Sequence, residues 1–510
     1  MSFPGVIFVV SFFPLLMGIA VYRLLWHPLA SFKGPKLAAV TDWWFCKKWL
    51  NGRYHQTLEK LQLQYGDVIR IAPNELVFAT PEAARDIYTR CNPDQDLQFI
   101  KQPPFYKQSE GFPTLVTETD PAAHRTLRKP LERGFSPSSL KDYGRVIERV
   151  ADDLTAQLEK ASEHSNAVDV KAWAARFTFD VITEVTFGKS SGTVAQGKNT
   201  VWLDLLTGNI AAAAVGVAIR RQPHAVKTLL RSIFAKLSKT AKLRAQYLSV
   251  CRKMCEERLR DPPKAANLFD HVLATCPPVE KDADNHGYLV FLQGQAAALV
   301  SGGTETSSTL LSSLIYNLLA HPAHLARLQY EVRNAFSQSG EIDIESTKQL
   351  KYLQAVIDES LRIFPPVGFG LPRVCPGAMI GGVYVPKGTV VQAPDILMVR
   401  NSRYFVRPYE FLPERWLPKD HEFYDEQFSG DRKEASKPFS LGPRQCIGMS
   451  LAYAEWRIVL AKLVLKFDWE IIGETQDLMD VARLKLLWEM PPILVSFKPV
   501  GGLAAASPGA

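Results

Sequence analysis

The sequence predicts a mainly α-helical domain of the α+β type, with small β elements at its margin. Between about residues 120 and 335, apolar residues recur at helical spacing, as in "SLKDYGRVIERVADDLTAQLEKA" and "RAQYLSVCRKMCEERLRD". A long apolar run from near Gly287 to Ala320 is stopped by His321-Pro322 and predicts a long interior helix. Two stretches, 67–80 and 379–395, show the alternation and turn residues typical of β-hairpins, the second turning at Pro386-Lys387-Gly388.

Size and composition favour one large folded domain. Length alone would suggest about three domains, but no stretch of the 510 residues resembles an interdomain linker. The contents of 46% hydrophobic and 22% charged residues are those of a protein with a large core. The net charge of +8 is mild and runs of Lys and Arg are absent, which argues against nucleic-acid binding.

The cysteines indicate reduced thiols. Their number, seven, is odd, and their spacing forms no disulfide framework, as expected for a protein facing the cytosol. Cys251 and Cys255 lie one helical turn apart without a second Cys/His pair nearby, so we interpret them as ordinary helix residues rather than zinc ligands.

The first residues predict a membrane anchor. Residues 1–22 carry no charged side chain and are long enough to cross a hydrocarbon layer of about 30 Å. Positive residues follow this run and none precedes it, which places the body in the cytosol. A cleaved signal peptide would require basic residues at its N-terminus and a cleavage site of small residues, and neither is present. We therefore expect a single-pass transmembrane anchor at 1–25, a Pro/Gly hinge at 26–40, one catalytic domain at 41–500 and a flexible tail at 501–510.

The stretch "GGTETS" places Gly302 and Gly303 inside the long helix, where each glycine costs about 1 kcal/mol relative to alanine. One interpretation is close packing against another helix. The other is that the missing side chains let a flat ligand lie against the helix. In that case Thr306, beside Glu305, could turn its hydroxyl towards the ligand and pass protons.

Two further pairs have both an ordinary and a functional interpretation. In "ESLR", Glu359 and Arg362 share one helix face, usually as a surface ion pair worth about 0.3 kcal/mol. The apolar, Pro-rich segment that follows would bury them, and Arg415 of "LPERW" could complete a structural Glu–Arg–Arg cluster. In "HRTLR", His124 and Arg128 lie one turn apart, which suits an anionic group or a solvated face equally.

The stretch "PFSLGPRQCIGMS" carries a cysteine directly before a helical run. The unpaired N–H groups and the dipole at the start of that helix would stabilise a thiolate at Cys446. Gly442 and Gly448 permit close approach of the backbone, and Arg444 adds positive charge. A thiolate held in this way is what an axial haem ligand requires.

The pattern F-x-x-G-x-R-x-C-x-G, from Phe439 to Gly448, resembles the haem-binding signature of the cytochrome P-450 family. Such a pattern should occur by chance in roughly one chain of this length in ten thousand. "GGTET" resembles the oxygen-activating stretch of that family, "ESLR" its E-x-x-R motif and "PERW" the partner of that motif, in the family's order. The resemblance covers essentially the whole chain, and the opening "YRLLWHPLASFKGPKLAA" is similar to that of microsomal members from filamentous fungi.

The resemblance implies the cytochrome P-450 fold, with haem b bound between the long central helix and the loop of Cys446. Cys446 would be the axial ligand of the haem iron, shielded by Phe439. Many members have W-x-x-x-R where this chain has His124 and Arg128, and an imidazole can also donate to a propionate. The resemblance then assigns the cofactor to ten residues: Cys446, Arg444, Phe439, Gly442, Gly448, His124, Arg128, Arg373, Gly302 and Gly303.

The implied activity is that of a haem-thiolate monooxygenase, which inserts one oxygen atom from O2 into an apolar organic substrate. Glu305 and Thr306 would organise water and deliver protons. Electrons would come from NADPH through NADPH-cytochrome P-450 reductase, with cytochrome b5 as a further donor, to a monomer anchored in the endoplasmic reticulum membrane. Substrate contacts are expected from 97–116, 205–219 and 365–372, whose apolar composition suits an intermediate of fungal secondary metabolism such as a polyketide, terpenoid or alkaloid.

Three other functions remain as alternatives. A haem-thiolate isomerase or dehydratase would keep the fold and need neither O2 nor reductase, but such members tend to lack the Thr/acid pair present here. A haem-binding sensor or electron carrier would bind haem without forming product. A haem-free membrane adaptor would show no Soret band.

Overall fold

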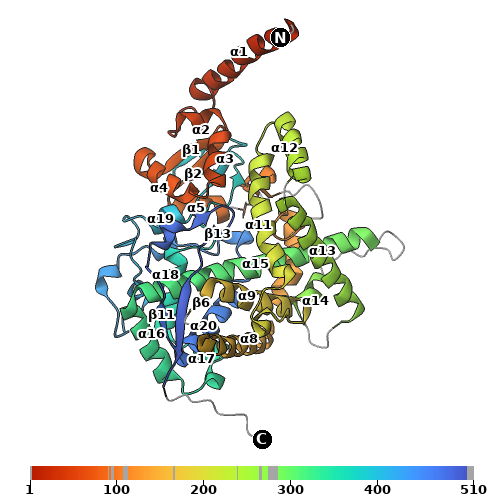
Figure 1. Cartoon of the computed structure of the whole chain (residues 1–510). Coiled ribbons are helices and arrows are strands. Elements are labelled where there is room, and N and C mark those ends of the chain that lie inside the picture. The colour runs from red at the N-terminus through yellow and green to blue at the C-terminus, as the bar shows by residue number, and fades with distance from the viewer. Residues whose placement is uncertain are drawn as a thin grey trace.

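The computed structural model describes residues 3–89, 91–92, 97–106, 113–164, 167–237, 239–262, 267–273 and 285–501. It is rich in helices, with short strands, as the sequence predicts (Figure 1). The helices expected within the two quoted periodic stretches are confirmed as α8 and α13, and the long apolar helix is confirmed as α15. The expected tail falls outside the described residues apart from Gly501.

The helices that shape the N-terminal half are α1 (Phe3–Leu25), α2 (Lys36–Val40), α3 (Trp43–Leu50), α4 (Tyr54–Tyr65), α5 (Pro81–Thr89), α6 (Pro103–Tyr106), α7 (Pro121–Gly134), α8 (Pro137–His164), α9 (Val170–Phe187), α10 (Thr193–Gln196), α11 (Val201–Arg220), α12 (His224–Leu237), α13 (Lys239–Arg260) and α14 (Leu268–Leu273). Those that follow are α15 (Asn285–Ala320), α16 (Pro322–Ala335), α17 (Ile344–Thr347), α18 (Lys351–Ile363), α19 (Ile396–Val399), α20 (Met449–Lys466) and α21 (Leu478–Val481). Short 3-10 turns include η3 (Pro413–Trp416) and η6 (Gly442–Arg444).

The strands form small sheets. One five-stranded sheet has the order β1-β2-β10-β7-β5, and a three-stranded sheet has the order β11-β14-β6. Their bounds are β1 Val68–Ala72, β2 Glu75–Phe78, β5 Ile100–Lys101, β6 Val168–Asp169, β7 Arg373–Val374, β10 Val390–Gln392, β11 Phe467–Ile471 and β14 Leu494–Pro499. The two-stranded pairs are β3 (Cys91–Asn92) with β4 (Leu97–Gln98), β8 (Ala378–Ile380) with β9 (Val383–Val385), and β12 (Arg483–Leu484) with β13 (Trp488–Glu489).

Helix α15 runs through the middle of the body (Figure 1) and packs against α9, α13, α18 and α20. Apolar residues are spread around the circumference of α15, and many of the positions between them are occupied by small Gly, Ala, Ser and Thr residues, which suits a helix with several packing partners. Proline at the first position of α16 ends α15 at the predicted place, because it cannot continue the hydrogen-bond ladder. The element that the sequence places at the centre is therefore at the centre of the fold.

The first hairpin is confirmed, and the second is wrong in its pairing. β1 and β2 pair antiparallel across Pro73-Asn74. Strand β9, however, pairs with β8 across Gly381-Gly382, whose φ angles of 53° and 82° fit a tight two-residue hairpin loop. The turn at Pro386-Lys387-Gly388 instead sends the chain into another sheet, where β10 pairs with β2 and β7.

The segment 26–40, expected to be a hinge, lies against the body. Leu29 is fully buried, and the buried Arg70 of β1 donates to the carbonyl oxygens of Arg23 (2.9 Å) and Leu29 (3.2 Å). Gly34 approaches the Arg70 carbonyl so closely that a Cβ would collide with it. This segment is therefore held in place by the sheet, and α1 extends away from the body (Figure 1).

Within the described residues, one helix is both long and apolar enough to cross a membrane, α11, with a mean hydropathy of 1.6. It packs against α13 and α3 and buries residues such as Trp202 and Leu206, which accounts for its apolar character. The described side chains of α1, Pro14–Leu25, form a shorter apolar stretch that exposes Leu15 and Met17.

A buried ionic cluster joins α18 to η3. The Glu359 carboxylate accepts from Arg362 Nε (2.8 Å) and Nη2 (2.7 Å) and from Arg415 Nε (3.1 Å), and these side chains are fully buried. Burial alone would raise the pKa of Glu359, but the two guanidinium groups outweigh it and hold the pKa below its ordinary value. Arg362 also donates to the carbonyls of Val399 and Pro408, so the cluster fixes the 399–416 segment to α18.

We expect Glu359→Gln to lower the free energy of unfolding by about 3–5 kcal/mol, because it leaves buried guanidinium groups without their counter-charge. Urea unfolding followed by circular dichroism measures this. The matched control is Glu345→Gln, which breaks an exposed pair with Lys348 and should leave the urea midpoint unchanged. Equal midpoints for the two variants would contradict a structural role for the cluster.

Candidate functional site

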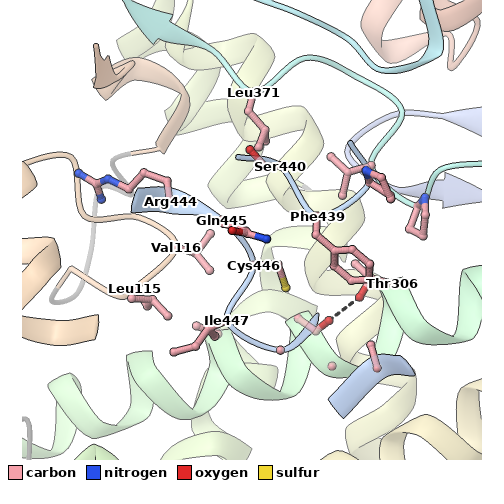
Figure 2. A pocket seen from close by; sticks show the side chains of 18 of the residues that line it. Leu115, Val116, Thr306, Leu371, Phe439, Ser440, Arg444, Gln445, Cys446 and Ile447 are labelled. Carbon is pink, nitrogen blue, oxygen red and sulfur yellow. Dashed lines mark hydrogen bonds between the residues drawn. The ribbon is translucent and has the colours of Figure 1, made fainter. Parts of the chain in front are cut away.

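A cavity of about 410 Å³ lies within the body, in the size range of small-molecule and cofactor sites. Its walls come from α7, α15, the segment before β7, and the 437–448 loop that leads into α20. Figure 2 shows Phe439, Gln445, Cys446 and Ile447 along that loop, with Leu115 and Val116 approaching from a separate segment. The "HRTLR", "GGTETS" and Cys446-loop motifs therefore all contribute residues to the lining of this cavity, whereas the Glu359 cluster does not.

The loop of Cys446 is shaped by backbone contacts. The Cys446 N–H donates to the Phe439 carbonyl at 2.9 Å, which closes the loop. Gly442 has φ +68°, and a Cβ there would collide with the Tyr88 carbonyl of α5. A Cβ at Gly448 would make only ordinary contacts, 3.9 Å from the Cys446 sulfur. Of the two glycines, the structure therefore requires Gly442, whereas Gly448 is the N-cap residue directly before α20.

Cys446 is accessible to the cavity although it lies deep in the protein. Burial raises the pKa of its thiol, and the Gly448 N–H and Arg128 only partly oppose this. Stabilisation of a thiolate by the start of the helix stays a prediction. A metal cation at the sulfur would deprotonate it outright. The thiol thus has the position and the chemistry of an iron ligand. Phe439 lies against Tyr453 and Trp456 of α20, with ring centroids 5.4 and 6.1 Å away, on the same wall.

Cationic groups converge on one edge of the cavity. Arg444 donates to the Glu118 carbonyl (2.9 Å), Arg128 to the Gln445 carbonyl (2.6 Å), and Arg373 to the Tyr106 hydroxyl (3.0 Å). All three guanidinium groups lie close enough to His124 to lower its pKa. Such an edge favours an anionic ligand, and two propionates fit the charge.

The same edge lowers the pKa values of two neighbouring bases. Burial, followed by the charges of nearby cations with Arg444 first, lowers the pKa of His124 to about 3 and that of Lys101 to about 6. His124 is therefore a neutral imidazole with one N–H to donate. Sequence reasoning did not identify Lys101, and its signal was a lone lysine within the apolar stretch "LQFIKQPPF".

Gly302 and Gly303 of α15 have different roles: one leaves space for a ligand, and the other permits close helix packing. A Cβ at Gly303 would lie 2.5 Å from Ile182 Cγ1, so this glycine permits α15 to pack against α9. A Cβ at Gly302 would meet nothing within 4 Å, and Gly302 lines the cavity. Gly302 therefore leaves room for a flat ligand, while Gly303 serves helix packing.

Thr306 and Glu305 point to different places. The Thr306 hydroxyl lines the cavity and donates to the Gly302 carbonyl at 2.6 Å. The Glu305 carboxylate accepts from the Thr207 hydroxyl of α11 at 3.3 Å, and Glu305 is not among the described residues lining the cavity. Burial raises the pKa of Glu305. The structure thus brings Thr306 to the site and leaves Glu305 directed towards α11.

A second acid, Glu455 of α20, was missed by sequence reasoning. It lines the cavity, is 1% exposed, and its Oε2 atom has no hydrogen-bond partner among the described residues. Burial raises its pKa to about 8, and a hydrogen bond from Ser307 of α15 only partly opposes this. The available signal was an acidic residue within the apolar helix "LAYAEWRIVLAKLVLK".

Two of the three expected substrate segments line the cavity. The first contributes Tyr106, Leu115 and Val116, with 107–112 outside the described residues. The third contributes Pro366, Val367, Phe369 and Leu371. No residue of the expected 205–219 segment is among the described lining residues, because α11 packs on α13 and α3.

The two glycines can be separated by experiment. In the haem-free protein we expect Gly302→Ala to raise the free energy of unfolding by up to about 1 kcal/mol, because alanine favours the helix and its Cβ enters open space. Gly303→Ala should lower it by about 1–3 kcal/mol through the clash with Ile182. Thermal unfolding measures both. In an Ile182→Ala background Gly303→Ala should cost nothing further, and an undiminished loss there would rule out this packing contact.

The buried Glu455 should make stability depend on pH. Its pKa is higher in the folded protein than in the unfolded chain, so the folded state is penalised increasingly as pH rises from about 4.5 to about 8. Between about pH 5.5 and 7 the wild type should lose about 1.4 kcal/mol per pH unit relative to Glu455→Gln, which stays neutral, and the loss per unit should diminish towards pH 8. Urea unfolding of both proteins at several pH values measures the difference. A difference that stays constant with pH would show that Glu455 does not bury a proton.

Comparison with known proteins agrees with this geometry. A family model described as Cytochrome P450 matches residues 35–497. The cytochrome P450 monooxygenase btcC of Colletotrichum orbiculare is 40% identical over 96% of this chain and 92% of its own length. BOA3 of Botryotinia fuckeliana, also a cytochrome P450 monooxygenase, is 35% identical over 90% of this chain and 89% of its own. Averantin hydroxylase of Aspergillus parasiticus is 36% identical over 94% of each chain. Because the match spans nearly the whole chain and includes the loop of the cavity cysteine, this protein belongs to the cytochrome P450 family and is a monooxygenase of the oxidoreductase class.

Proposed function

We propose that the protein is a haem-thiolate monooxygenase that inserts one oxygen atom from O2 into an apolar organic substrate of fungal secondary metabolism. The observation that supports this best is the Cys446 sulfur, which faces a cavity whose edge gathers Arg128, Arg373 and Arg444. A soft anionic ligand on the wall and several cations at the edge match haem b, which needs an axial ligand and partners for its propionates.

Each binding role follows from the position of the residue. Cys446 ligates the iron, and Phe439 keeps water from its sulfur. Arg128, Arg373 and Arg444, with the neutral His124, donate to the propionates, and Lys101 joins them. Gly302 leaves the space that a flat macrocycle needs beside α15. When bound, haem supplies the activation of O2, and the protein supplies ligation, orientation and control of water.

Thr306 is the proposed proton donor at the site. Its Oγ1 donates to the Gly302 carbonyl, which leaves its oxygen lone pairs open to accept from water in the cavity. A small rotation would turn its proton from that carbonyl towards the cavity. We keep Glu305 as the proposed source of further protons, reached when its carboxyl group leaves Thr207.

The substrate wall is largely apolar. Leu115, Val116, Leu299, Val367 and Phe369 all line the cavity, which suits a hydrophobic molecule oriented by a few polar groups. The names of the relatives, monooxygenase and hydroxylase, support oxygen insertion over the isomerase or dehydratase alternative. A polyketide, terpenoid or alkaloid intermediate remains our proposal for the substrate.

The proposed setting is the endoplasmic reticulum membrane. Residues 1–25 form a single-pass anchor, 26–40 lead into the body, 41–500 form one cytosolic catalytic domain, and 501–510 form a tail. NADPH-cytochrome P-450 reductase supplies electrons, cytochrome b5 is a further donor, and the protein acts as a monomer. The apolar, exposed side chains of Pro14–Leu25 and the basic net charge of +8 support the anchor and an acidic redox partner, respectively.

Microsomes that contain this protein and a reductase should convert apolar metabolites extracted from the source fungus after deletion of this gene. With NADPH and isotopically labelled O2, we expect products that carry one labelled oxygen atom. Cys446→Ala should abolish conversion, because the iron loses its thiolate. Mass spectrometry of the extract measures this. Conversion that proceeds without NADPH or O2 would favour the isomerase or dehydratase and contradict the proposal.

A further inference from the structure

A compact turn, residues 113–119, forms part of the cavity wall and is called here the 113–119 turn. Its two apolar side chains, Leu115 and Val116, line the cavity (Figure 2), and Val116 is 53% exposed. Thr114 and Thr117 staple the turn internally, since each backbone N–H donates to the hydroxyl of the other, at 2.9 and 3.2 Å. The turn therefore keeps its own shape, and outside contacts decide where it lies.

Three side chains from other elements hold the turn by its backbone. Gln295 of α15 accepts from the Leu115 N–H (3.4 Å) and donates to the Pro113 carbonyl (3.0 Å). Lys101 of β5 donates to the carbonyls of Leu115 (3.1 Å) and Val116 (2.7 Å). Arg444 holds the far end through the carbonyls of Glu118 and Thr119.

The burial of Gln295 indicates that its hydrogen bonds to the 113–119 turn contribute to stability. Its side chain is 3% exposed on a helix whose neighbouring cavity residues are Ala298, Leu299 and Gly302. Burying an amide without partners is costly, and here both its oxygen and its nitrogen find their partners on the turn. Lys101, at 6% exposed, likewise directs its amine to two carbonyls of the turn. Gln295 and Lys101 thus contact the backbone of the 113–119 turn through hydrogen bonds.

We infer that Gln295 is a positioning residue that, together with Lys101, fixes the 113–119 turn and so sets which ligand shapes fit against Leu115 and Val116. This inference rests on the proposed function, because the wall selects ligands only if haem occupies the cavity beside it. Gln295 acts through the turn and has no part in proton transfer or iron ligation.

Gln295 is the residue to test, because Lys101 and Arg444 also belong to the cationic edge. Replacing either of those would disturb haem retention as well as the wall. Gln295→Met keeps the length and volume of the side chain and removes both hydrogen bonds. Gln293→Met is the matched control: it makes the same change two residues earlier on α15, at a partly exposed position that is not among the described lining residues.

The probes are imidazole and 4-phenylimidazole, which coordinate haem iron and shift its visible spectrum. Imidazole is small and reports the iron alone, whereas the phenyl ring reaches the surrounding wall. We expect Gln295→Met to weaken 4-phenylimidazole about tenfold, the equivalent of one to two net hydrogen bonds. It should leave imidazole affinity and the reduced-CO spectrum unchanged, and Gln293→Met should change neither affinity.

A double-mutant cycle separates positioning from direct contact with the probe. In a Leu115→Ala, Val116→Ala background the wall is gone, so Gln295→Met should have no further effect on 4-phenylimidazole affinity. An undiminished tenfold effect in that background would show that Gln295 touches the ligand itself and would overturn the inference. An unchanged affinity in the single variant, or equal weakening of imidazole, would overturn it as well.

If no variant and no wild type binds imidazole at iron, the proposed function fails rather than this inference.

Discussion

The rest of this structure depends on one electrostatic constraint at the cavity. The Cys446 thiol, whose pKa burial raises, faces the cavity from one wall, while cationic side chains line the same cavity. A group with a metal cation and two carboxylates would suit both features, because the sulfur could ligate its metal and the cationic side chains could bind its carboxylates. The cavity residues therefore fit haem on charge as well as on space.

The surrounding fold holds this arrangement through a few shared residues. Tyr88 of α5 is one of them: its hydroxyl donates to the Leu371 carbonyl and accepts from the N–H groups of Leu371 and Ala393, each at 3.1 Å. Its own carbonyl packs against Gly442, where no side chain would fit. One residue thus links the substrate wall to the cysteine loop. Farther away, the buried ionic cluster of Glu359, Arg362 and Arg415 fixes the 399–416 segment to α18.

The sequence was sufficient where local rules decide the outcome. The apolar periodicity and the stop at His321-Pro322 predicted α15. The motif around Cys446 located the loop because glycine and cysteine have specific local requirements there. The second hairpin was mispaired because two turn signals compete within 379–395, and only the partner strands decide between them.

Tertiary neighbours decided the rest. The two helix glycines could not be told apart until α9 and the cavity were seen on their separate sides. Glu305 and Thr306 are adjacent in sequence, but a helix directs neighbouring side chains about 100° apart, so they reach different surroundings. Lys101, Gln295 and Glu455 are each a polar residue in an apolar segment. The neighbouring sequence does not indicate which backbone carbonyls or which cavity such a side chain contacts in the folded protein.

The most direct test of the central claim is the reduced-CO difference spectrum of the protein purified with its haem. The account requires a Soret band at the long-wavelength position of thiolate ligation. A band at the shorter wavelength typical of histidine ligation, or no band in folded protein, would contradict the assignment of Cys446 as the ligand.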